Sequence, residues 1–164
     1  MKDFPILTTE HLLLDAYRDS DEDRVAAILH QADVFKNVFG ENEHALNRFL
    51  SDLKQQAKCD APDMIHWMAR LRKGDPVIGC VKARAYQSQS VELVFFLDED
   101  ERRNKYGFEM VSEVVSHLVS LNGVEKLWAS VRSAATAHIL VKKLGFEHLL
   151  PTSRCYLMLG RHHG

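Results

Sequence analysis

Several features that define other protein classes are missing from this chain of 164 residues. No apolar run is long enough to cross a bilayer, and the first residues lack the basic segment and cleavage site of a secretory signal. The cysteines Cys59, Cys80 and Cys155 are widely spaced and odd in number, and no CxxC pair occurs. These absences argue against a membrane span and a disulfide framework. We therefore expect a soluble protein of the reducing cytoplasm.

A large excess of charge of one sign is also absent, since the chain has 21 basic and 23 acidic residues. A nearly neutral chain has no electrostatic footprint for a polyanion, so we expect neither nucleic acid nor a membrane surface as a partner. The chain has nine histidines, but no pair shows HExxH spacing, and His162 and His163 stand at the terminus. No metal site is predicted. A nucleophile elbow and a P-loop are absent as well.

The chain does have enough apolar residues, 46%, to bury a core of its own. Because no repeat or composition shift divides it, we expect one domain over residues 1–164. Residues 34–42 show no clear period and are predicted to connect two helices. This connection either is simply packed on the core or borders a substrate site. Apolar spacing predicts strands at 7–14, 64–71, 77–86, 91–97, 126–131 and 155–159, and helices beginning near residues 20, 43, 106 and 133.

The most informative segment is the basic turn at residues 101–109, which joins the predicted strand 91–97 to a long amphipathic helix. A strand that ends in a turn and feeds a helix aims unpaired backbone N–H groups and the positive end of the helix dipole at the space in front. An anion is the natural occupant of that space. The turn is therefore predicted to cradle phosphate. The alternative is a solvated charge cluster whose members pair locally.

The turn resembles the pyrophosphate loop of the GNAT acetyltransferase superfamily. The pattern of that loop is Arg or Gln, two variable residues, Gly, one variable residue, then Gly or Ala. Arg102 and Gly107 match its first and last positions, whereas Lys105 stands at the middle glycine. Lys105 brings a Cβ and a long side chain to the place where backbone meets phosphate. It either adds a cation to the phosphates or fills their space.

Three further segments resemble the branch of this superfamily that acetylates the N-terminal alanine of ribosomal proteins. They are residues 7–14, residues 91–98, and residues 125–131 followed by 136–146. His11 replaces the usual Arg of the first segment, and Val94 replaces the Gly of the second. The resemblance implies an α/β (α+β) fold. Its GNAT-like central sheet would be mixed and mostly antiparallel, with about six to seven strands, a splay between strands 4 and 5, and helices on both faces.

The resemblance also implies a function, namely attack of a primary amine on the thioester of acetyl-CoA. In the family the backbone of the fourth strand holds the pantetheine arm, and Phe95, Phe96 and Leu97 occupy those positions. Phe95 and Phe96 could equally serve only as packing residues of a strand. The pyrophosphate would be held by Arg102, Arg103, Asn104, Lys105, Tyr106 and Gly107. The acceptor would be a protein N-terminus or a small-molecule amine.

Two residues are candidates for proton transfer. Glu92 matches the acidic position of the family's fourth strand and could take the amine proton through a water, although a Glu there also commonly points to solvent. The family's proton donor to the thiolate falls on Ala137 or Val141, and neither side chain can donate. His138 lies one residue from the first of these positions, which is a large rotation on an α-helix. The alternative for His138 is an ordinary exposed histidine.

The chain departs from the family pattern at Val94, Lys105, Ala134 and Ala137. These departures support a competing hypothesis of another class, a degenerate GNAT-fold protein that binds CoA or a protein partner without catalysis. The sequence leaves open whether the chain forms a homodimer. It also leaves open which amine is the acceptor.

Overall fold

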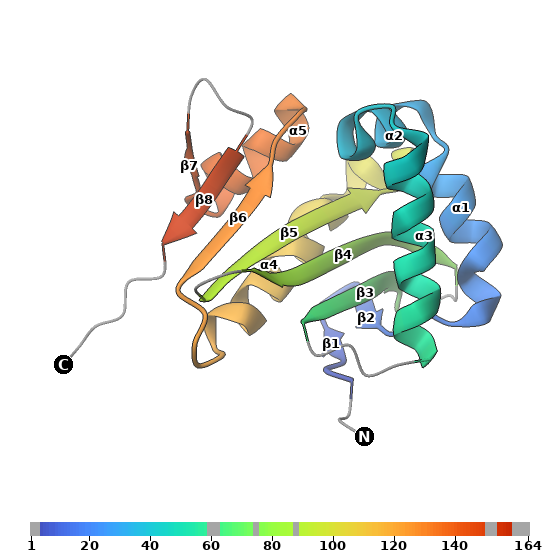
Figure 1. Ribbon diagram of the computed structural model, residues 1–164, viewed down its shortest axis with the longest axis horizontal. Coiled ribbons are helices and arrows are strands. Elements are labelled where there is room, and N and C mark those ends of the chain that lie inside the picture. Colours follow the sequence, from blue (N-terminus) through green and yellow to red (C-terminus); the bar gives the residue numbers. More distant parts are fainter. Residues whose placement is uncertain (1–3, 59–62, 74–75, 87–88, 150–153, 159–164) are drawn as a thin grey trace.

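The computed structural model describes residues 4–58, 63–73, 76–86, 89–149 and 154–158. In these residues one sheet of eight strands has the order β1-β2-β3-β4-β5-β6-β8-β7 (Figure 1). The strands are Leu7–Thr8 (β1), Leu12–Asp15 (β2), Met64–Leu71 (β3), Val77–Tyr86 (β4), Ser90–Leu97 (β5), Lys126–Ser130 (β6), Glu147–His148 (β7) and Arg154–Met158 (β8). Only β5 and β6 pair in parallel. The mixed, mostly antiparallel sheet is confirmed, and two of its strands have only two residues each.

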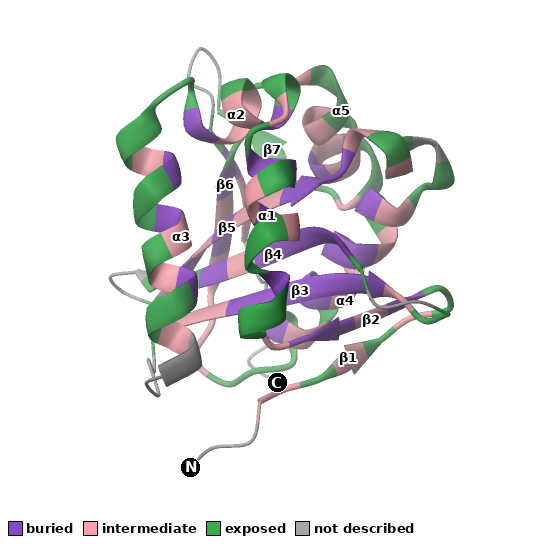
Figure 2. Ribbon diagram, turned by 90° about the vertical axis from the view of Figure 1, so that its right-hand side faces the viewer, coloured by how far each residue is buried: buried purple, intermediate pink, exposed green. Residues whose placement is uncertain are grey.

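Helices cover both faces of the sheet, as the sequence predicts (Figure 1). They are Asp19–Asp21 (η1), Glu22–Leu29 (α1), Ala32–Phe39 (α2), Glu43–Lys58 (α3), Glu99–Asn104 (η3), Tyr106–Val119 (α4), Ala134–Ala137 (α5) and His138–Lys143 (η4). Helices α1, α2 and α3 share one buried cluster with the sheet, while α4 and η4 share the other. Figure 2 shows buried positions on the strands and on the helix sides that face them.

Strand alternation explains these two clusters. Leu93 of β5 belongs to the cluster under α4, whereas Phe96 belongs to the cluster under α1 to α3. Residues of opposite parity on a strand point to opposite faces. The apolar run of β5 is therefore continuous because both faces of this strand are covered.

Residues 32–39 form the helix α2, so the prediction of a loop in this segment is wrong. Val34 and Phe39 are buried in the core that α2 shares with α1 and α3. The helix has only eight residues, and its N-cap Gln31 makes no side-chain capping bond. Such a short helix depends on packing rather than on local signals. It ends at Gly40, which adopts the left-handed conformation at φ 60°.

The predicted first strand, residues 7–14, is divided into β1 and β2 by a turn. The backbone N–H of Thr9 donates to the carbonyl of Leu12 at 2.9 Å. From α4, the carboxylate of Glu109 accepts the backbone N–H of His11 at 2.7 Å and also the hydroxyl of Thr9. The turn is therefore held by a contact distant in sequence, which periodicity does not reveal.

The parallel pair β5–β6 is short. Its register runs from Ser90 opposite Lys126 to Leu93 opposite Ala129 and then stops. On its other edge β5 remains paired with β4 as far as Leu97. The two strands therefore diverge beyond Leu93 (Figure 1). This is the predicted splay between the family's fourth and fifth strands.

His66 of β3 is buried beside α3, with 1% of its surface exposed. The side-chain oxygen of Gln56 accepts its backbone N–H at 3.0 Å and also lies against Nδ1. Among the described residues, Nε2 has no hydrogen-bond partner. Burial, assisted by the charge of Lys82, lowers the pKa of His66 from 6.5 to about 3. The folded protein therefore holds this ring neutral.

We expect His66 to make stability depend on pH. Between these pKa values the unfolded chain binds a proton that the folded chain does not, so the free energy of unfolding falls as the pH drops, by about 1.4 kcal/mol per pH unit. Urea unfolding from about pH 6.5 to about pH 4.5 measures this slope. In His66→Gln the slope should be smaller by about 1.4 kcal/mol per pH unit, because the variant lacks this difference of one proton. The variant His30→Gln, at an exposed position, should keep the wild-type slope. Equal slopes for wild type and His66→Gln would contradict the assignment.

Candidate functional site

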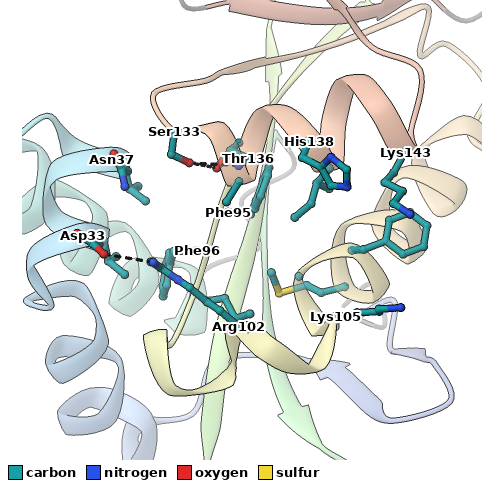
Figure 3. Close-up of a pocket in the computed structure, with 18 residues that line it drawn as sticks. Asp33, Asn37, Phe95, Phe96, Arg102, Lys105, Ser133, Thr136, His138 and Lys143 are labelled. Atoms are coloured by element: carbon teal, nitrogen blue, oxygen red, sulfur yellow. Dashed lines mark hydrogen bonds and ion pairs between the residues drawn. The ribbon is translucent and has the colours of Figure 1, made fainter.

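A cavity of about 650 Å³ lies where β5 leaves β6 (Figure 3). Its walls come from α2, β5, the loop before α4, the start of α4, and α5 with η4. The lining residues are Asp33, Val34, Asn37, Val38, Phe95, Phe96, Leu97, Arg102, Lys105, Gly107, Phe108, Met110, Ser133, Ala135, Thr136, His138, Ile139 and Lys143. Phe96 lies on one face of the sheet and Leu97 on the other. The cavity therefore passes through the splay.

Asp98, at the end of β5, positions the loop that follows. Its carboxylate accepts bonds from Gln31 at 2.9 Å, from the backbone N–H of Asp100 at 3.1 Å, and from Arg24. Burial favours a higher pKa for this carboxyl, but these bonds and the charge of Arg24 outweigh burial and lower the pKa of Asp98 below its usual value. The side chain of Gln31 also accepts the N–H of Glu99 at 3.1 Å. These bonds tie η3 to α1 and to the start of α2.

Lys105 forms the joint between η3 and α4. It is the N-cap of α4 and adopts the left-handed conformation, with φ 63° and ψ 16°. Glycine adopts this conformation freely, so the backbone at this position keeps a glycine-like path although the residue is lysine. The helix that follows has 14 residues, and its first turn faces the cavity through Gly107. A Cβ at Gly107 would lie 3.2 Å from Cδ1 of Ile139, which explains a glycine there.

Two contacts link α2 to the other walls. Arg102 of η3 pairs with Asp33 at 3.4 Å (Figure 3). Arg132 follows β6 and donates to the carbonyl of Val38 at 3.1 Å. Together these contacts hold α2 against the loop on one side and against the segment before α5 on the other.

Asn104 and Tyr106 lie outside the cavity lining. Asn104 donates to Glu101 at 3.3 Å, and the Tyr106 ring lies 5.8 Å from the ring of His11. The side chain of Arg103 falls outside the described residues. Of the predicted cofactor-binding residues, the structure therefore brings Phe95, Phe96, Leu97, Arg102, Lys105 and Gly107 together.

The charges of the lining are unequal. Arg102, Lys105 and Lys143 are cationic, whereas Asp33 is the one carboxylate among the described residues of the lining. Much of the remaining lining is apolar, and it includes two phenylalanines of β5. An excess of cations beside a helix N-terminus favours an anionic ligand. The cavity suits a long ligand with an anionic end and an uncharged arm.

The helix that closes the cavity contains a π turn. Ser133 caps α5, as the sequence predicts, by accepting the N–H of Thr136 at 3.1 Å. Residues 138–143 then follow π geometry, and the N–H of Leu144 bonds to the carbonyl of Ile139 at 3.0 Å. A π turn holds one more residue than an α turn and often occurs at functional sites. The prediction that the family's proton donor falls on Ala137 or Val141 takes no account of such a turn.

Because of this extra residue, side chains before the π turn are rotated relative to Gly145. His138 lines the cavity, whereas Ala137 and Val141 are not among its lining residues. Figure 3 shows the His138 ring on the helix that borders the cavity. His138 lies one residue from the donor position predicted at Ala137, and a π turn contains one residue more than an α turn. The π turn thus accounts for this offset.

Glu92 is not among the lining residues of the cavity. It stands opposite Arg84 of β4 and Trp128 of β6, one position before the last β5–β6 pair. By alternation it shares the sheet face of Phe96, and it is partly exposed. Its role as a base stays a prediction.

Two parts of the lining were incompletely predicted from the sequence. The first is α2, which supplies Asp33, Val34, Asn37 and Val38. A border of the substrate site was one of the two interpretations of this segment, but its helical structure was not predicted. The apolar residues at 34, 35, 38 and 39 have helical spacing, so this part of the wall had a usable signal. The second is Lys143, the last residue of the π-helical segment η4, and the sequence has no signal for that segment.

A sheet that opens between two parallel strands beside an anion-favouring loop and helix defines the acetyltransferase class. The sequence matches the family described as Acetyltransferase (GNAT) domain over residues 11–147, so the chain belongs to the GNAT acetyltransferase family. The resemblance drawn from the motifs is confirmed. The chain is 26% identical over 148 residues to the uncharacterized N-acetyltransferase YoaA of Bacillus subtilis, covering 88% of this chain and 84% of that protein.

Solved structures agree on the fold. Spermidine N-acetyltransferase of Vibrio cholerae, solved with CoA and spermine, superposes with a TM-score of 0.73 at 14% identity, covering 92% of this chain and 97% of that one. Ribosomal-protein-S5-alanine acetyltransferase of Vibrio fischeri superposes with a TM-score of 0.70 at 12% identity, covering 93% and 96%. At such identities the likeness concerns the fold.

Two further observations apply to the described ranges. None of the helices there combines the length and the apolar character that a membrane crossing requires. No cluster of three or more His, Cys, Asp or Glu side chains in the described residues has an arrangement suited to a metal ion.

The left-handed backbone of Lys105 predicts an unusual response to glycine. Lys105→Gly should leave the free energy of unfolding unchanged or raise it, because relief of the left-handed conformation offsets the entropy of glycine in the unfolded chain. Lys142→Gly, within η4, should lower it by about 1 kcal/mol. Lys105→Val should also lower it, since β-branched residues resist this conformation. Urea unfolding compares the three variants, and a clearly destabilised Lys105→Gly would contradict the backbone assignment.

Proposed function

We propose that this protein transfers an acetyl group from acetyl-CoA to a primary amine by direct attack. One observation carries the proposal. The cavity at the splay is bordered both by the part of β5 that does not pair with β6 and by a cationic loop at the N-terminus of α4. Membership of the GNAT family supports the same reaction. The acceptor classes proposed are a peptide N-terminus and a small-molecule amine.

The residues of the cavity fit the two ends of this donor. The pairing with β6 stops at Leu93, so the β6-side edge of residues 94–97 is available for the amides of a pantetheine arm. Backbone N–H groups at the start of α4 face the pyrophosphate position, and Arg102, which also lines the cavity, adds a cation there. Arg102 would exchange or share its contact with Asp33 when phosphate binds. Apolar side chains exclude water from the arm between these ends.

Acetyl-CoA supplies an electrophilic thioester and a thiolate leaving group when it is bound. The acceptor amine must lose a proton before it can attack, because amines of this kind are largely protonated at neutral pH. Glu92 is the proposed base. It stands next to the last β5–β6 pair and is partly exposed, so a water can connect its carboxylate to an amine at the splay.

His138 is the proposed proton donor to the departing sulfur. The π turn directs it to the cavity that the pantetheine arm would occupy. An imidazole can donate a proton near neutral pH, unlike the alanine at the preceding position. This assignment replaces the donor that the family pattern places on the last helix.

Calorimetric titration with acetyl-CoA, followed by thiol-release assays on a panel of amines, tests the proposal. The panel should contain N-terminal peptides and polyamines, because the names of two structural neighbours give a ribosomal-protein alanine and spermidine as acceptors. Saturable binding with turnover of an amine supports acetyl transfer. Binding with no turnover of any panel member would favour the degenerate CoA-binding module, for which the alanines at 134 and 137 argue. Absence of binding would refute the donor assignment.

Glu92→Gln should lower kcat for acetyl transfer by about 10²-fold to 10⁴-fold, because the amine loses its proton acceptor. The Kd for acetyl-CoA should change less than about twofold, since the carboxylate lies outside the cavity lining. Glu43→Gln, on the exposed start of α3, is the matched control and should retain activity. An unchanged kcat in Glu92→Gln would remove Glu92 from the mechanism.

His138→Gln should lower kcat by about 10²-fold and remove the alkaline limb of the pH–rate profile, because that limb reports loss of the donor's proton. Exposed His30→Gln should leave both unchanged. Steady-state rates between about pH 6 and about pH 9 distinguish the two variants. A His138→Gln enzyme that keeps the wild-type profile would show that His138 only borders the cavity.

A further inference from the structure

Two lysines from different elements lie on the same side of the cavity. Lys105 precedes α4, and Lys143 is the last residue of η4. Figure 3 draws both on the side away from Asp33, with Lys143 above and Lys105 below. Both line the cavity, and neither pairs with a carboxylate of the described residues.

The two sides of the cavity therefore differ in charge. On the α2 side, the cation of Arg102 is balanced by Asp33 at 3.4 Å. On the lysine side, neither of the two lysines that line the cavity pairs with a carboxylate of the described residues. Like charges that line one cavity repel, and a doubly charged anion that contacts both relieves that repulsion. The lysine side is thus suited to a dianion.

We propose that Lys105 and Lys143 form a subsite for a phosphate monoester, by which the protein selects the 3′-phosphate of CoA. The inference rests on the proposed function, because it assumes that a CoA thioester occupies the cavity. The pyrophosphate is accounted for by the backbone N–H groups at the start of α4 and by Arg102. Lys143 belongs to a different element, η4, and a phosphate monoester, with up to two charges at neutral pH, matches the lysine pair.

The proposal explains the departure of Lys105 from the glycine of the family pattern. The left-handed backbone at φ 63° preserves the path of the loop, so the lysine adds a cation without moving the N–H groups of α4. Lys142 provides a built-in comparison. It is exposed and adjacent to Lys143 in sequence, but it does not line the cavity.

Calorimetric titration of the whole protein with CoA and with 3′-dephospho-CoA tests the subsite. Wild type should bind CoA about tenfold or more tightly than the dephospho form. Lys143→Gln should weaken CoA binding about tenfold and leave binding of the dephospho form unchanged. Lys142→Gln should behave as wild type. The double variant Lys105→Gln, Lys143→Gln should bind the two compounds equally, and thermal unfolding confirms that each variant is folded.

The outcomes separate this proposal from the proposed function. Equal binding of the two compounds by wild type, or equal weakening of both by Lys143→Gln, would overturn the subsite even if acetyl transfer is observed. A CoA preference that Lys143→Gln abolishes would support the subsite even if no amine is turned over. Failure of wild type to bind either compound would overturn both proposals.

Discussion

The end of the parallel pairing between β5 and β6 is the constraint on which the rest of the site depends. After Leu93 and Ala129 the two strands separate, while β5 stays paired with β4 to Leu97. A strand edge released inside a sheet must be covered or offered to a ligand, because unpaired backbone groups are costly when buried. Here α2 stands on one side of the gap and α5 with η4 on the other. The separation thus creates the cavity. It also leaves the β6-side backbone groups of β5 beyond Leu93 unpaired with β6, so the amides of a ligand can bond to them.

Charged and polar side chains at the end of β5 position the loop that borders the cavity. Asp98 gathers Gln31 and Arg24 and so fixes where η3 begins. The chain then turns at a left-handed Lys105 and enters α4, whose N-terminus faces the cavity. The short segment from Asp98 to Gly107 is held at its start by Asp98 and at its end by the packing of Gly107 on Ile139. The loop, the helix dipole and the cationic side chains therefore all act on a ligand in the cavity.

Two departures from the family pattern have structural counterparts. Lys105 replaces a glycine but retains a glycine-like φ. Ala137 leaves the expected donor position without a polar group, but the π turn brings the neighbouring His138 to the cavity. Backbone geometry at 105 and helix geometry at 138–143 are therefore more informative about this site than residue identity alone. Val94 and Ala134 have no comparable structural counterpart.

The sequence by itself determined the central strands, the position of the basic turn between β5 and α4, and the Ser133 cap, because these follow from local periodicity, helix dipoles and side-chain capping. It also carried enough of the family motifs to predict the splayed sheet. Only the tertiary structure decided the helix α2, the division of residues 7–14, the Arg102–Asp33 pair and the placement of Lys143 on the same side of the cavity as Lys105. Each of these depends on contacts between residues far apart in the chain. Local patterns contain no information on such contacts, since packing free energy arises only when the elements meet.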